Sequence, residues 1–123
     1  MKARIFVVSP YRAETQAGRV ANIRLAWALC EAVVQAGFAP FAPHLFYTEF
    51  LDDAHPVERE LGISCGLAWL GVASEVWVYA ADVEHCSSGM RAEIEVARRR
   101  GVRVVFMPHQ FAGVRPFQVG GGS

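Results

Sequence analysis

The sequence predicts an α/β fold in which helices cover both faces of a parallel sheet. Short apolar runs, typical of buried strands, alternate along the chain with longer segments of helical spacing. The first four predicted strands are separated from one another by helices, as parallel strands require. With 123 residues, the chain is long enough for one such unit but not for two. We therefore expect a three-layer α/β sandwich with right-handed crossovers.

The N-terminal part of the chain predicts one strand and one long helix. Ala3–Val8 is a continuous apolar run that ends at a Ser-Pro turn, which is typical of a strand buried on both faces. A helix is expected over about Gln16–Ala36, with Thr15 as its N-cap and Gly37 as its stop. Its buried stripe is expected from the apolar residues that repeat every three or four positions, Val20, Ile23, Trp27, Cys30 and Val34.

The middle of the chain predicts a second strand, a long loop and a second helix. Phe38–Phe41 is a short strand limited by nearby prolines. The stretch APHLFYTEFLDDAHP is aromatic and acidic without clear periodicity, so we expect a loop, and loops of this length are usually functional or mobile. Helical spacing returns over Val57–Leu70, through the apolar positions Leu61, Cys65, Ala68 and Trp69.

The remaining chain predicts the other half of the sheet. Glu75–Ala80 is the third strand, and a helix is expected over about Gly89–Arg100, before the stop residue Gly101. Val102–Met107 is the fourth strand, and Val114–Val119 is a weak fifth.

The whole pattern predicts one domain over residues 1–119. Its sheet is expected to be parallel, of the Rossmann or flavodoxin-like kind, with four to five strands. Residues 120–123, GGGS, are expected to be a flexible tail, either native or an added linker.

Ligands of such a sheet bind beyond the carboxyl ends of its strands. Three segments are expected at that edge: SPYR after the first strand, PHLFYTEFLDD after the second and DVEHCSSG after the third. We therefore expect these segments to face one cleft.

Composition and charge narrow the classes of function. The formal net charge is zero, which argues against binding to a nucleic acid polymer, and no apolar segment is long enough to span a bilayer. The three cysteines form no CxxC pair and the four histidines form no HExxH motif, so neither a disulfide framework nor a metal site is expected. The motifs GxGxxG, GxxxxGK[ST] and GxSxG are also absent. We expect a cytoplasmic protein that needs no cofactor.

Two glutamates near the start of the third predicted helix have opposite expected positions. At about 100° per residue, Glu93 lies at the edge of the apolar sector that contains Met90 and Ile94, whereas Glu95 points to solvent. Burial disfavours the charge of Glu93, while the nearby helix N-terminus favours it. The residue is either a candidate catalytic carboxylate or simply an acidic complement to the helix dipole.

Small residues precede this glutamate. Ser87, Ser88, Gly89 and Met90 offer hydroxyls and unpaired amide groups at a helix start, which suits an anion. N-capping by Ser88 explains the same residues without a ligand. The position after a central strand favours a binding role.

Other candidate ligand-binding residues come from the first two loops. Ser9, Tyr11 and Arg12 follow the first strand, and an arginine there can hold a phosphate or carboxylate through two hydrogen bonds. The alternative is an ordinary strand-ending turn. His44 can hydrogen-bond a ligand or be packed and satisfied among its aromatic neighbours. Its aromatic neighbours are Phe46, Tyr47 and Phe50. They either stack on a flat ring of the ligand or cover the edge of the sheet.

Taken together, these motifs resemble the nucleoside 2-deoxyribosyltransferase-like superfamily, which includes small, often phage-associated members. The resemblance is carried by SPYR, APHLFYTEFLDD, EVWVYA and SSGMRAEIEVA, and so covers most of the chain. It implies that Glu93 is the nucleophile and that Ser87–Met90 hold the sugar or its 5′-phosphate. It also implies that Ser9–Arg12 line the same pocket, and that the protein is a homodimer or a higher homo-oligomer.

The function implied by the resemblance is hydrolysis or base exchange at the N-glycosidic bond of a nucleoside or nucleoside 5′-monophosphate. The leaving base needs an acid, and relatives carry an aspartate where this chain has Gly66. The acid could instead come from one of four loop residues, Asp52, Asp53, Asp82 or Glu84. Asp82 is also expected to bind the ligand. The alternative functions are a nucleotide-binding module without turnover and a small structural oligomer, for which Trp27 and Trp69 provide apolar surface.

Overall fold

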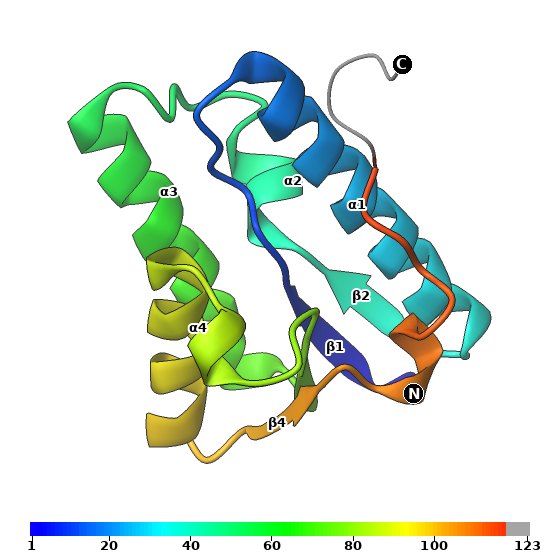
Figure 1. Ribbon diagram of the computed structural model, residues 1–123. Helices are drawn as coiled ribbons and strands as arrows, with labels where there is room; N and C mark the ends of the chain where they lie inside the picture. The colour runs from blue at the N-terminus through cyan, green and yellow to red at the C-terminus, as the bar shows by residue number, and fades with distance from the viewer. Residues whose placement is uncertain (118–123) are drawn as a thin grey trace.

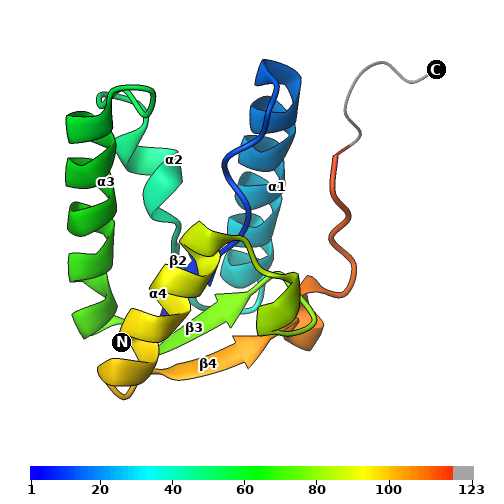
Figure 2. The same ribbon diagram turned by 60° about the vertical axis from the view of Figure 1, so that its left-hand side comes forward.

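The computed structural model describes residues 1–117, which form a parallel sheet between two layers of helices (Figure 1). The sheet has four strands in the order β2-β1-β3-β4, and every neighbouring pair is parallel. Figure 2 shows β3 and β4 side by side and pointing the same way. The predicted α/β sandwich with a flavodoxin-like sheet is confirmed. The strands are β1 (Arg4–Val8), β2 (Ala39–Phe41), β3 (Glu75–Val78) and β4 (Arg103–Phe106).

Side chains that alternate along β1 and β3 build two separate cores. Ile5 faces the helix α1 (Gln16–Gln35), and its neighbour Phe6 faces the helix α4 (Ser88–Arg99) on the other side of the sheet. Trp77 of β3 joins the α1 side in the same way. Both faces of the central strands are therefore buried, which explains why their sequences are continuously apolar rather than alternating.

The ends of α1 are as predicted, but its buried face is not. Thr15 accepts a hydrogen bond from the amide of Gly18, and Gly37 ends the helix with a positive φ of 94°. The predicted stripe was wrong, because Trp27 is 59% exposed and most of that stripe faces solvent. This helix is apolar on nearly all sides, so spacing alone did not select the stripe that meets the sheet. The face against the sheet is made by Ala21, Leu25, Leu29 and Val33.

The expected long loop after β2 contains a short helix, α2 (Pro43–Tyr47), which begins at a proline. The predicted second helix is present as α3 (Pro56–Ala68), and a 3₁₀ turn, η1 (Trp69–Val72), follows it. Figure 2 shows α3 running alongside α2, with which it packs. The apolar residues whose spacing predicted this helix, Leu61, Cys65, Ala68 and Trp69, are exposed.

The structure also corrects the start of α4 and the end of the chain. Ser87, in an extended conformation, is the N-cap and Ser88 is the first helical residue, one position earlier than predicted. The predicted fifth strand is not formed over residues 114–117, and residues 118 and 119 lie outside the described part, as does the expected tail. A 3₁₀ turn, η3 (His109–Phe111), instead brings Phe111 into the α1 core. Among residues 1–117, no helix has the length and apolar character needed to cross a membrane.

Candidate functional site

A cavity of about 210 Å³ lies beyond the carboxyl end of β1. The chain leaves β1 toward β2 on one side and returns to β3 on the other, so the strand order switches direction between β1 and β3. Such a switch point leaves a crevice at the strand ends. The cavity wall comes from four segments, within residues 9–12, 43–53, 58–67 and 87–93. All three loops expected at one cleft contribute to it, together with the helix α3.

The start of α4 forms one end of this pocket. Ser87 Oγ accepts a hydrogen bond from the amide of Met90 at 3.3 Å, which fixes the first turn of the helix. The pocket is lined here by Ser87, Ser88, Gly89, Met90 and Glu93. The four residues predicted as a cradle and the predicted nucleophile therefore lie on one wall.

Glu93 has an unusual environment for a carboxyl group. It is partly buried, lines the pocket and lies next to the buried residue Ile94. Desolvation raises the pKa of Glu93 from its ordinary value of 4.5 to about 8. Glu95 is exposed and lies 4.0 Å from Arg99 in an ion pair, so the two glutamates differ as the helical spacing predicted.

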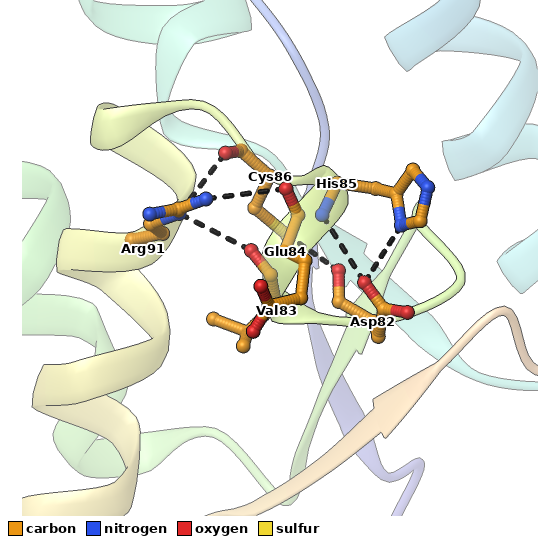
Figure 3. A network of polar contacts seen from close by, with 6 residues as sticks. All are labelled: Asp82, Val83, Glu84, His85, Cys86 and Arg91. Carbon is orange, nitrogen blue, oxygen red and sulfur yellow. Dashed lines mark hydrogen bonds and ion pairs between the residues drawn. The ribbon is translucent and has the colours of Figure 1, made fainter.

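The loop that leads into α4 is organised by one arginine. Arg91 Nε donates to the carbonyl oxygens of Val83 and Cys86, each at 3.1 Å, and Nη2 donates to that of Glu84 at 3.2 Å. Figure 3 shows the guanidinium pointing into this loop from the first turns of the helix. These bonds tie the 3₁₀ turn η2 (Val83–His85) to α4 and so position the residues between them.

Asp82 does not line the pocket, contrary to its prediction as a ligand-binding residue. Its carboxylate caps η2 and accepts a hydrogen bond from His85 Nδ1 at 2.7 Å (Figure 3). This bond lowers the pKa of Asp82. The prediction was wrong because the short Asp82 side chain hydrogen-bonds within the turn that follows it instead of reaching the cleft.

The exit from β1 forms the floor of the pocket. Ser9 is 4% exposed, and its hydroxyl has no hydrogen-bond partner among the described residues. The ring of Tyr11 packs against that of His44 with the ring centroids 5.1 Å apart. Both residues line the pocket together with Arg12.

His44 is partly buried, and its buried Nε2 atom has no hydrogen-bond partner in the described part of the chain. Desolvation lowers the pKa of His44 to about 4, so its imidazole is neutral at physiological pH. A neutral imidazole can present either a donor or an acceptor to a ligand, depending on its tautomer. The aromatic neighbours of His44 differ in position: Tyr47 lines the pocket, whereas Phe46 and Phe50 are largely exposed.

The helix α3 forms the wall that sequence reasoning missed. Arg59, Gly62, Ile63 and Gly66 follow helical spacing and all line the pocket. Two glycines on one helical face are the signal that was available, since they let another segment approach the helix closely.

A charged cluster joins this wall to the β1 exit. Asp53 Oδ1 lies 3.6 Å from Arg59 Nε, and Asp53 Oδ2 lies 3.8 Å from Arg12 Nε. Glu58 also lines the pocket, and its Oε1 accepts a hydrogen bond from the amide of Asp52 at 2.9 Å. Of the acids considered as proton donors, Asp53 lines the pocket, whereas Asp52, Asp82 and Glu84 do not.

Gly66 occupies the place where an acidic residue was expected from the resemblance. A Cβ atom at this position would lie 2.8 Å from the Cβ of Pro43, which is closer than such atoms approach. The Pro43 ring of α2 would therefore have to shift to make space for any side chain at position 66. Among residues 1–117, no group of three or more histidine, cysteine or acidic side chains could hold a metal ion.

The comparisons with known proteins agree with the fold. A family model described as "Domain of unknown function (DUF7768)" matches residues 3–107. No protein of curated function matches the sequence. Among solved structures, a 2-deoxyribosyltransferase from Bacillus psychrosaccharolyticus is similar with a TM-score of 0.65 and 15% identity, over 85% of this chain and 71% of that chain.

Proposed function

We propose that this chain, which belongs to the DUF7768 family of domains, cleaves or exchanges the N-glycosidic bond of a nucleoside or nucleotide. Its fold is that of a 2-deoxyribosyltransferase, which supports transfer of a nucleoside base as the broad reaction class. The observation that carries the proposal is the Glu93 carboxyl group in the pocket, within the first two turns of α4.

In this proposal Glu93 is the nucleophile. One carboxylate oxygen forms a bond to the anomeric carbon, while the N-glycosidic bond breaks and its electron pair leaves with the base. Water then releases the free sugar, or a second base takes its place. With a pKa of about 8, roughly one molecule in ten carries the ionised form of Glu93 at pH 7, so the reaction should accelerate as the pH rises.

The departing base also needs a proton. Asp53 is the remaining acidic candidate whose side chain lines the same pocket, although it is engaged with two arginines. Residues Ser87–Met90 are placed by the proposal at the sugar, where the hydroxyls and amides of a helix start bind oxygen atoms well.

The test is release of free base. The protein is incubated at pH 8 with a panel of nucleosides and 5′-monophosphates, and the products are separated by chromatography. We expect release that is lost in Glu93→Gln and retained in the matched control Glu95→Gln, whose glutamate is exposed on the same helix. Absence of release from every substrate, or release that Glu93→Gln leaves intact, contradicts the proposal.

A second candidate is a nucleotide-binding module without turnover. Gly66 favours it, because Pro43 would have to shift for any side chain at the position where an acid was expected. Calorimetric binding of a nucleotide by a protein that releases no base would select this candidate over the enzyme.

We further propose a cytoplasmic homo-oligomer. The support is exposed apolar surface, since Trp27 is 59% and Trp69 50% exposed. Sedimentation at micromolar concentration tests the assembly, and a monomer at all concentrations contradicts it.

A further inference from the structure

Three buried side-chain atoms among the described residues lack a hydrogen-bond partner, and all three belong to residues that line the same pocket. They are Ser9 Oγ after β1, His44 Nε2 in α2 and Arg59 Nε in α3. Buried polar groups are nearly always paired, because an unpaired one has lost its water without compensation. Three such atoms around one cavity indicate that a ligand supplies the missing partners.

Arg59 specifies the chemistry of that ligand more narrowly than the other two residues. A guanidinium group only donates hydrogen bonds, so its missing partner is an acceptor. The Asp53 carboxylate lies 3.6 Å from Arg59 Nε and 3.8 Å from Arg12 Nε, and both distances exceed a hydrogen bond. One carboxylate thus faces two guanidinium groups without hydrogen-bonding to either Nε atom.

At the opposite end of the pocket, the start of α4 already has one of its amides paired, since Ser87 Oγ accepts a hydrogen bond from the amide of Met90. The raised pKa of Glu93 keeps most of that carboxyl group uncharged at neutral pH. The Glu58 carboxylate is engaged by the amide of Asp52. With Glu93 mostly uncharged, the two remaining carboxylates that line the cavity, Asp53 and Glu58, balance its two arginines, so a phosphate does not face a net negative charge.

We infer that the ligand of this pocket carries a phosphate group, which Arg59 and Arg12 bind on the α3 side while the sugar lies at the start of α4. Guanidinium groups suit phosphate because they offer parallel donors and a full charge. The preferred substrates are then nucleoside 5′-monophosphates rather than neutral nucleosides. The nucleoside part of this inference rests on the proposed function, whereas the phosphate part rests on the pocket wall.

The experiment is calorimetric titration with five probes: inorganic phosphate, ribose, ribose 5-phosphate, a nucleoside and its 5′-monophosphate. We expect each phosphorylated sugar compound to bind roughly tenfold or more tightly than its uncharged counterpart. Arg59→Gln should remove most of that preference. The matched control is Arg24→Gln, since Arg24 is exposed on α1 and does not line the pocket.

Each outcome bears on the inference. A preference that survives Arg59→Gln, or phosphorylated probes that bind no better than uncharged ones, overturns it. Ribose 5-phosphate binding that depends on Arg59, without any binding of nucleosides or release of base, keeps the phosphate site and rejects the proposed function. If Arg59→Gln does not fold, Arg12→Gln supplies the comparison, because the Arg12 side chain is 65% exposed and its loss should leave the fold intact while reducing the preference.

Discussion

The raised pKa of Glu93 predicts that this residue destabilises the folded protein at high pH. A carboxyl group with a pKa of about 8 in the folded state and 4.5 in the unfolded chain holds its proton more tightly when folded. Between these two pH values the unfolded chain binds fewer protons than the folded one, so stability falls as the pH rises. At low pH, where both states are protonated, the effect disappears.

The size of the effect follows from the same difference. The shift from 4.5 to about 8 corresponds to at most about 5 kcal/mol in the free energy of unfolding. Because Glu93 keeps part of its surface accessible, solvent screening reduces this, and we expect Glu93→Gln to stabilise the protein by about 2–3 kcal/mol at pH 9. At pH 4 the variant and the parent should have nearly equal stability.

Urea denaturation followed by circular dichroism, repeated at intervals between pH 4 and pH 9, measures this difference directly. The control is Glu95→Gln on the exposed side of α4, which should keep the decline of the parent protein. Parallel curves for Glu93→Gln and the parent across this range would refute the reasoning, because the carboxyl group would then have the same pKa in both states.

Three more predictions concern packing, acid stability and thiol chemistry. Gly66→Ala should destabilise the protein by roughly 1–3 kcal/mol, because the added Cβ atom meets Pro43. Thermal melts test this against Gly62→Ala on the same helical face, which makes only ordinary contacts and should not destabilise the protein. His44 has a pKa lowered to about 4, so stability should fall as the pH drops from 6.5 toward 4, and His44→Gln should weaken that fall in the same urea assay. Iodoacetamide should modify Cys65 first, as mass spectrometry can show, because it is exposed while burial raises the pKa of the other two thiols. Earlier labelling of either other cysteine contradicts this.

The sequence predicted the four strands of the sheet and the helices α1, α3 and α4 because their signals are local. Apolar runs, the Thr15 cap and the glycine stops are read within a few residues of where they act. The buried face of a helix was harder to predict. The spacing of α1 allowed two apolar stripes, and only the approach of the sheet selects the one that contains Leu25 and Leu29.

The candidate site was predictable where residues follow a strand directly. Ser9 and the Ser87–Met90 turn are placed by the sheet itself, so topology brought them to one cavity. Arg59 was not predictable, because its position depends on how α3 packs against α2, which is a tertiary contact. The Asp82 prediction failed because a short side chain found a partner in its own turn.

The central place of β1 has a consequence for how the chain is made. This strand is synthesised first, but it pairs with β2 at residues 39–41 and with β3 at residues 75–78. Its edge toward β3 therefore remains open until residues 75–78 have left the ribosome, since the partner strand does not exist before then. During that interval an apolar strand with unpaired amides is exposed to other chains, which is a condition that favours aggregation. Nascent chains stalled before residue 75 should be the form that most needs a chaperone.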